Sequence, residues 1–245
     1  MRYGVFSDVH GNFEALRAVL DFYRKNGIEN FICCGDIVGY GPQPQECAAA
    51  LLALKNLTAV LGNHDAAVVG RMDVKWFNQN AAWAIDFSRS NLSGEAMDFI
   101  SRLPERVETA DFTLVHGSPR KPLTEYLLSE LQFTDNLQAW AVSPCFIGHS
   151  HMPLYFRNSR DTGLPAADFM RSMDRIALPP GPVIFNPGSV GQPRDGDPRA
   201  SCGIYDTERK IFDHFKVFYD VGATQRRMGD LRMPGMLAER LSYGY

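Results

Sequence analysis

Five of the six histidines in this chain lie in short polar segments that each follow an apolar run. The densest segment is His149-Ser150-His151, directly after Cys145-Phe146-Ile147. In an extended segment, side chains two residues apart point to the same face. The spacing therefore predicts two imidazoles directed into one site, an arrangement that suits neighbouring metal ions.

Carboxylates and an amide accompany these histidines. In chain order, the polar segments contain Asp8 with His10, Asp36, Asn63 with His64, His116, and His149 with His151. A lone histidine is usually structural, but burying five of them without partners would be costly. Divalent metal ions remove that cost because imidazole nitrogens and carboxylate and amide oxygens all bind metals.

The ligand types indicate the chemistry. Two divalent ions about 3.5–4 Å apart can clamp a phosphoryl group and produce hydroxide from bound water. A ligand that bridges two ions needs two oxygens, so a carboxylate is expected between them. Since the set contains no thiolate, it favours manganese, iron, zinc, nickel or cobalt without choosing among them.

Strands alternating with helices are predicted to position these segments. Apolar runs that each end in one polar segment are expected to be strands at residues 3–7, 31–34, 58–61, 112–115 and 145–147. Helices are expected from residue 13 to about residue 25 and from residue 44 to about residue 54. This order indicates an α/β layout with parallel strands, whose carboxyl ends are the usual place for a ligand site.

The remaining elements are less regular. Residues 67–104 are expected to be helical, and they could form either a cap over the site or an ordinary packing layer. A helix is predicted at about residues 135–141, and residues 157–181 are expected to form a long loop or hairpin. Strands are predicted at 154–156, 183–185, 201–205 and 210–218, followed by surface helices in the last ~25 residues.

Length, composition and charge limit the possible domain organisation, partners and location of the protein. The 245 residues, 45% of them hydrophobic, can form one sizeable domain, and we assign residues 1–245 to it. The net charge is -3 and no Lys/Arg block is present, so a long nucleic acid is not an expected partner. The chain shows neither a signal-peptide pattern nor an apolar run of ~20 residues, so we expect a cytoplasmic protein without a membrane partner. The five cysteines are expected to be buried free thiols.

The motifs together resemble a known family. They are Asp8-x-His10, Gly35-Asp36, Gly62-Asn63-His64-Asp65, His116-Gly117 and Gly148-His149-Ser150-His151. This set, in this order over about residues 3–205, resembles the calcineurin-like metallophosphoesterases, especially their small single-domain prokaryotic branch. The resemblance implies a four-layer αββα sandwich with two central mixed sheets.

The resemblance also implies roles for individual residues. One metal would be held by Asp8, His10 and His151, the second by Asn63, His116 and His149, and Asp36 would bridge both. His64 would contact the phosphoryl group and either protonate the leaving oxygen or stabilise charge there. Asp65 would orient His64 through its other ring nitrogen.

Two further residues are candidates for substrate binding. Asn12 could reach the substrate, although an N-cap explains it equally well. Arg194 follows residues 186–191, which look like a loop near the site in this family branch. Its guanidinium could pair with a phosphate oxygen, or it could be a solvated surface side chain. His214 lies far from any motif and is expected to be structural.

These features predict a phosphoesterase that uses metal-bound hydroxide with the assistance of His64. A small phosphate ester is the expected substrate, with a phosphodiester favoured over a phosphomonoester. Protein phosphatase activity would need a long open groove, which the short loops do not favour. A catalytically silent binding scaffold remains the alternative from another class, because fold does not determine function. The sequence does not indicate the oligomeric state.

Overall fold

Successive side chains along the central strands face two different hydrophobic layers. The computed structural model describes residues 1–245, and in it β1 (Arg2–Phe6) directs Phe6 toward the helices and Val5 toward a second sheet. In β5 (Thr113–Val115), Leu114 joins the same inter-sheet cluster as Val5, whereas Val115 faces the opposite side with Phe133. Since side chains alternate along a strand, both sheets are apolar on both faces and must be covered twice.

Two mixed sheets of six strands form the centre of the molecule. The first has the order β3 (Leu57–Ala59), β2 (Asn30–Cys33), β1, β11 (Ala200–Asp206), β12 (Ile211–Val217) and β9 (Arg175–Ala177). The second has the order β4 (Arg106–Glu108), β5, β6 (Cys145–Phe146), β10 (Val183–Pro187), β7 (Pro153–Asn158) and β8 (Pro165–Phe169). Strands β1, β2 and β3 are parallel to one another, as are β5, β6 and β10. The remaining pairs are antiparallel.

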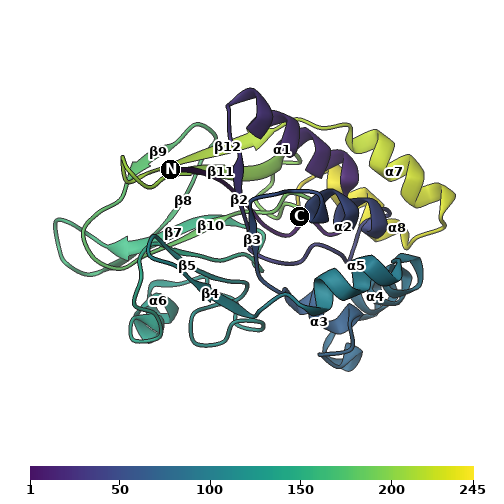
Figure 1. Ribbon diagram of the computed structural model, residues 1–245, viewed down its shortest axis with the longest axis horizontal. Helices are drawn as coiled ribbons and strands as arrows, with labels where there is room; N and C mark the ends of the chain where they lie inside the picture. The colour runs from purple at the N-terminus through teal and green to yellow at the C-terminus, as the bar shows by residue number, and fades with distance from the viewer.

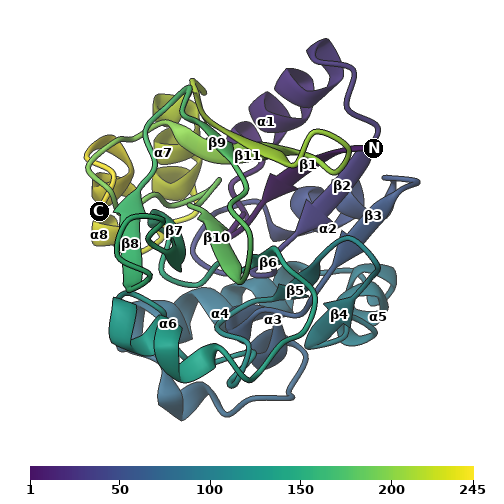
Figure 2. The ribbon, with the colours of Figure 1, turned by 90° about the vertical axis from the view of Figure 1, so that its left-hand side faces the viewer.

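Helices cover the outer face of each sheet. The first sheet is covered by α1 (Phe13–Lys25) and α2 (Pro44–Leu52), and the second by α6 (Glu130–Asn136). Helix α1 begins where the Asn12 side chain accepts a hydrogen bond from the Ala15 amide, and it buries Leu16, Val19 and Tyr23. The layers can be followed in Figures 1 and 2, with α1 and α6 at opposite sides of the paired sheets. The predicted αββα sandwich is confirmed.

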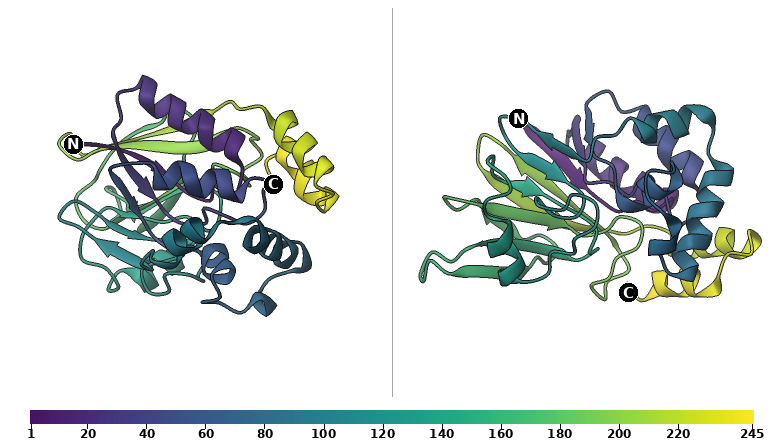
Figure 3. Two further views of the ribbon diagram at one scale, coloured as in Figure 1. Left: turned by 45° about the vertical axis from the view of Figure 1, so that its right-hand side comes forward. Right: turned by 90° about the horizontal axis from the view of Figure 1, so that it is seen from below.

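Two helical groups extend beyond the sandwich on one side of the molecule (Figure 3). The first contains α3 (Asn63–Val68), the 3₁₀ turn η1 (Val74–Trp76), α4 (Gln79–Asn91) and α5 (Gly94–Ser101). The second is C-terminal and contains α7 (Val221–Asp230), α8 (Gly235–Glu239) and η2 (Arg240–Ser242). A small hydrophobic cluster joins α4 to the C-terminal group through Ala84, Met228 and Leu237. None of the helices combines the length and apolarity needed to cross a membrane.

Two local predictions need adjustment. The helix predicted at about 135–141 instead covers residues 130–136, because the Ser129 side chain caps it by accepting from the Gln132 amide. Residues 157–181 are not a plain loop. They complete β7 and contain β8, which pairs with β7 as the expected hairpin, and β9, which joins the edge of the other sheet.

Candidate metal centre

Loops from both sheets meet at one end of the sandwich. They follow the parallel strands β1, β2 and β3 of the first sheet and β5, β6 and β10 of the second. Because parallel strands end at the same edge, their loops gather there. The structure brings together all seven residues predicted as ligands, and each is buried: Asp8, His10, Asp36, Asn63, His116, His149 and His151.

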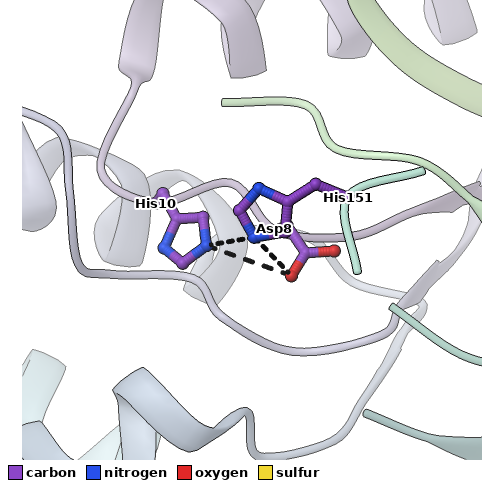
Figure 4. A group of neighbouring side chains, drawn as sticks. All are labelled: Asp8, His10 and His151. Carbon is purple, nitrogen blue, oxygen red and sulfur yellow. Dashed lines mark hydrogen bonds and ion pairs between the residues drawn. The ribbon is translucent and has the colours of Figure 1, made fainter. Parts of the chain in front are cut away.

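One group consists of Asp8, His10 and His151 (Figure 4). The Nε2 atoms of His10 and His151 lie 3.0 Å apart. Asp8 Oδ1 lies 3.4 Å from Nε2 of His151 and 3.9 Å from Nε2 of His10. These three ligand atoms therefore surround a single point, although they come from the loops after β1 and β6.

The hydrogen bonds of the two imidazoles determine their tautomers. Nδ1 of His10 lies 3.2 Å from the Val38 carbonyl, and Nδ1 of His151 lies 2.6 Å from the Gln192 carbonyl. A carbonyl can only accept, so each Nδ1 carries the hydrogen, and each Nε2 carries a lone pair. Two lone pairs that face each other at 3.0 Å repel unless a cation lies beside them. This arrangement, with backbone carbonyls behind the imidazoles, is the one that metal-binding histidines use.

A second group contains Asp36, Asn63, His116 and His149. Nδ1 of His116 donates to the Cys34 carbonyl at 2.8 Å, so Nε2 is the ring nitrogen that faces the centre, 2.9 Å from Asn63 Oδ1 and 3.4 Å from Asp36 Oδ2. Nε2 of His149 is buried and has no hydrogen-bond partner. The residues fit a metal ion because the buried Nε2 of His149 is otherwise left without a partner, and because an ion can take the place of the proton on Nε2 of His116 among these oxygen ligands.

Asp36 lies between the two groups. Its Oδ2 is 3.4 Å from Nε2 of His116 in the second group and 3.5 Å from Nε2 of His10 in the first. Its Oδ1 accepts a hydrogen bond of 2.9 Å from the His64 amide, which orients the carboxylate. Asp36 is thus placed to serve both groups.

Burial keeps most of these imidazoles neutral. It lowers the pKa of His149 to about 3 and the pKa values of His10 and His151 well below their usual range. His116 differs, because the neighbouring Asp36 carboxylate outweighs burial and raises its pKa to about 9. Burial also raises the pKa of Asp8 to about 7. Neutral imidazoles are the form that binds metal, so the protein holds three of them ready at neutral pH.

The backbone at the ligands is unusual. Five of the seven have positive φ, namely Asp8 (53°), His10 (49°), Asp36 (55°), His149 (67°) and His151 (60°). This region is uncommon for residues other than glycine, and such conformations gather at functional sites. The premise that His149 and His151 lie in an extended segment is therefore wrong. His151 faces His10, whereas the His149 ring stacks on Tyr126 at 3.9 Å and lies 4.9 Å from that of His116.

Two glycines before ligand residues are explained by close packing between loops. A Cβ at Gly62 would overlap the Asp36 carboxylate, and a Cβ at Gly148 would overlap the Ser7 hydroxyl. Glycine at these positions lets the loops approach closely enough for their ligands to meet.

The predicted hydrogen bond between Asp65 and the His64 ring is absent from the structure. The Asp65 carboxylate instead accepts the backbone amides of Ile37, Val38 and Gly62 at 3.1–3.2 Å. These amides are buried, and a buried amide without a hydrogen-bond acceptor is energetically unfavourable, so the carboxylate accepts from them. Nδ1 of His64 is buried without a partner. Asp65 therefore positions the loops that carry Asp36 and His64, rather than the imidazole.

The two predicted substrate-binding residues differ in their surroundings. Asn12 caps α1, and its side chain also bonds Gly191, Tyr219 and Thr224, so its polar atoms are occupied within the protein. Of the two explanations for Asn12, the structure supports the N-cap. Arg194 has no acidic partner.

Arg194 is part of the electrostatic environment of the centre. Its guanidinium carbon lies 6.0 Å from the ring centroid of Tyr40, its Nε is buried without a hydrogen bond, and its one side-chain hydrogen bond goes to Gln192. Its charge helps to lower the pKa values of His64 and His151, although burial is the larger cause.

Aromatic residues around the centre were not predicted. The Tyr40 ring lies 4.7 Å from that of His10 and 4.6 Å from that of His64. Phe77 approaches His64 edge-on at 4.9 Å, and Tyr126 stacks on His149. Tyr40 lies only four residues after Asp36, in a glycine-rich loop, so its position in the sequence was a usable signal. Phe77 and Tyr126 come from segments without a motif, so the sequence contains no signal for their positions.

Comparison with known proteins agrees with this geometry. Residues 1–210 match the calcineurin-like phosphoesterase superfamily domain. An uncharacterized protein of Methanocaldococcus jannaschii is 35% identical over 245 residues, covering 98% of this chain and 97% of that protein. A crystal structure of a metallophosphoesterase from Sphaerobacter thermophilus superposes with a TM-score of 0.90 at 37% identity, covering 100% of this chain and 99% of that one. A hypothetical protein of Pyrococcus horikoshii shares the fold, with a TM-score of 0.80 at 19% identity and coverage of 100% and 98%. The chain therefore belongs to the calcineurin-like phosphoesterase superfamily.

Proposed function

We propose that this hydrolase is a dinuclear metal-dependent phosphoesterase that acts on small phosphate esters, with phosphodiesters favoured. The observation that carries the proposal is the pair of Nε2 lone pairs of His10 and His151, 3.0 Å apart, with Asp36 reaching from them to His116. Without cations this arrangement of lone pairs and buried carboxylates is unfavourable. When bound, two ions supply Lewis acidity toward the phosphoryl oxygens and make a nucleophile of water at neutral pH.

The seven ligands divide between two positions. The first ion would be held by Asp8, His10 and His151, the second by Asn63, His116 and His149, with Asp36 shared. Backbone carbonyls of Val38, Gln192 and Cys34 fix three of the imidazoles by accepting their Nδ1 hydrogens. This support keeps the ligand nitrogens aimed inward before any ion arrives.

His64 assists the reaction as a neutral hydrogen-bond donor. Burial lowers its pKa to about 4, so the ring is uncharged at neutral pH and cannot act as an imidazolium acid without help from the substrate. A neutral imidazole can still donate a hydrogen bond to a phosphoryl or leaving oxygen and stabilise the charge that develops there. Of the two roles predicted for His64, charge stabilisation is the one that burial favours.

Arg194 supplies a cation at the edge of the centre. No carboxylate pairs with this guanidinium, and its Nε lacks a partner. An anionic substrate would therefore bind more tightly to it than to a guanidinium already paired with a carboxylate. We propose that Arg194 binds a phosphate oxygen of the substrate.

Two adjoining pockets, one of which opens onto the centre, support the preference for a diester. One, of about 570 Å³, includes Asn63, His64 and His149 in its lining. The other, of about 650 Å³, lies on the C-terminal side, and the two share Tyr40 and Asn78. A diester has two substituents on its phosphorus and can use both spaces, whereas a monoester has one. The first pocket is lined by Met72, Trp76, Phe77, Asn78 and Ala81, and we propose that this part of residues 67–104 caps the site.

The test combines metal analysis with an ester comparison. Elemental analysis should find two divalent ions per chain, and a bis-aryl phosphate should be hydrolysed faster than the matching mono-aryl phosphate with manganese, iron, zinc, nickel or cobalt added. Faster hydrolysis of the mono-aryl ester would reverse the diester assignment. A protein that is inert on both esters with every metal would support the binding-scaffold alternative instead.

A further inference from the structure

The pocket that contains His64 and His149 has an unusual lining. Seven of its thirteen residues are apolar or aromatic: Tyr40, Met72, Trp76, Phe77, Ala81, Leu123 and Tyr126. No carboxylate lines it, and Lys121 is its one lysine or arginine. Its volume of about 570 Å³ is in the range of small-molecule sites.

The aromatic rings of the pocket come from two separate segments of the chain. Trp76 and Phe77 belong to the turn between α3 and α4, whereas Tyr126 belongs to the loop after β5. Phe77 meets the edge of the His64 ring, and Tyr126 stacks on His149, so each segment contacts a residue of the centre. A group attached to a phosphorus held at the centre would therefore extend into a pocket lined by aromatic rings.

The exposed ring of Trp76 is difficult to explain by folding alone. Its relative exposure is 85%, although it lies beside the partly buried Phe77, and it is in no buried hydrophobic cluster. Tyr126 is also 44% exposed. Large aromatic surface left open at the mouth of a polar centre gains stability when a flat apolar ligand covers it.

From these observations we infer that the site selects phosphate esters that carry a planar aromatic substituent, a nucleobase or a simple aryl group, bound against Trp76, Phe77 and Tyr126. The inference rests on the proposed function for the phosphoryl end of the substrate. The aromatic rings provide the selectivity. Lys121 at the same pocket is compatible with an anionic ligand and offers no base-specific hydrogen-bond pattern.

Binding of four carbon-linked phosphonates to the manganese-loaded protein tests the inference, because these compounds cannot be hydrolysed. The first pair is the phosphonate analogue of adenosine 5′-monophosphate and that of ribose 5-phosphate. The second pair is benzylphosphonate and cyclohexylmethylphosphonate. Calorimetry should show at least one aromatic member binding about fivefold to a hundredfold more tightly than its non-aromatic twin. Preference within only the first pair would identify the aromatic group as a nucleobase, and preference within only the second pair would identify it as a simple aryl group.

Trp76→Ala should reduce that preference at least threefold, while Trp83→Ala should leave it unchanged. Trp83 is a matched control because it stacks on Phe87 along α4 and does not line the pocket. Since Trp76 is exposed, its replacement should not disturb folding. No aromatic preference in either pair, or an equal loss in both variants, would overturn the inference.

Hydrolysis of the corresponding phosphate esters is measured separately. Aromatic preference in binding without hydrolysis would contradict the proposed function and leave the pocket assignment intact. Hydrolysis of aromatic and non-aromatic esters at equal kcat/KM, with equal binding, would support the phosphoesterase and reject the aromatic selection.

Discussion

The floor and the rim of the candidate site are built in opposite ways. The floor consists of seven buried candidate ligands on short loops after parallel strands, five of them with positive φ. The rim consists of partly exposed aromatic residues from the α3–α4 turn and the loop after β5. Backbone carbonyls and amides bond the side chains of five of the seven floor residues, whereas the rim rings are held mainly by ring contacts.

This difference indicates a division of labour. Atoms that must hold cations need fixed positions, and deeply buried hydrogen bonds provide them. Atoms that recognise an organic substituent need only a surface of suitable shape, which exposed side chains on loops can provide. Changes in the floor should therefore remove activity outright, and changes at the rim should alter which substrates are used.

The largest effect is expected from Asp36→Asn. The substitution removes the negative charge between the two groups and replaces one of the two oxygens by an NH2 group that cannot bind a metal, so at least one ion should be lost and hydrolysis should fall to background. Metal content by elemental analysis and initial rates on a bis-aryl phosphate are the measurements. Asp98→Asn, an exposed carboxylate on α5, is the matched control and should behave as wild type. Full activity with two ions in Asp36→Asn would show that Asp36 is not shared.

A smaller loss is expected for His64→Ala, because this residue lies at the floor without being a proposed ligand. Removing one preorganised donor should lower kcat by about 10²–10³ while both ions remain bound. Since the pKa of about 4 makes the ring a neutral donor at neutral pH, donation to a non-bridging phosphoryl oxygen should give a similar loss for p-nitrophenyl and methyl leaving groups. A loss confined to the methyl ester would instead identify His64 as the acid that protonates the leaving oxygen.

Arg194→Gln should have an intermediate effect, since Arg194 lies where floor and rim meet. Loss of a charge-assisted hydrogen bond to phosphate should raise KM about tenfold to a hundredfold, with a smaller change in kcat. Arg199→Gln is the control, because Arg199 is in the same loop region but is paired with Asp197. Equal kinetics in both variants would mean that Arg194 is a surface side chain.

The smallest effect on catalysis is expected for Asn12→Ala. This change removes the N-cap of α1 and the buried bonds to Gly191, Tyr219 and Thr224, so it should reduce the free energy of unfolding by more than the ~1 kcal/mol of a typical cap, with kcat/KM changed less than about threefold. Ser93→Ala, which removes only the N-cap of α5, should give the smaller loss of a cap alone. Denaturant unfolding and initial rates distinguish the cases. A large loss of kcat/KM at unchanged stability would instead indicate that Asn12 binds the substrate.

Much of this protein could be predicted from the sequence because its informative residues are local to strand ends. Apolar runs predicted the central strands, and polar segments after them named every residue that meets at the floor. The αββα fold followed from the family motifs rather than from periodicity, which could not divide twelve short strands between two sheets. The helix at 130–136 was misplaced because its start depends on the Ser129 cap rather than on an apolar pattern.

The chemical identity of the floor is therefore determined by the sequence, since residue type decides which atoms can bind a metal. Only the tertiary structure decided how those atoms face one another. His149 and His151 both have positive φ, and their rings contact different residues. The Asp65 carboxylate accepts hydrogen bonds from the amides of Ile37, Val38 and Gly62 rather than from the His64 ring. The aromatic rim joins residues about fifty positions apart in the sequence, at Trp76 and Tyr126, through folding alone. Such choices depend on competition among long-range hydrogen bonds and on close approach of loops, neither of which a local pattern of residues contains.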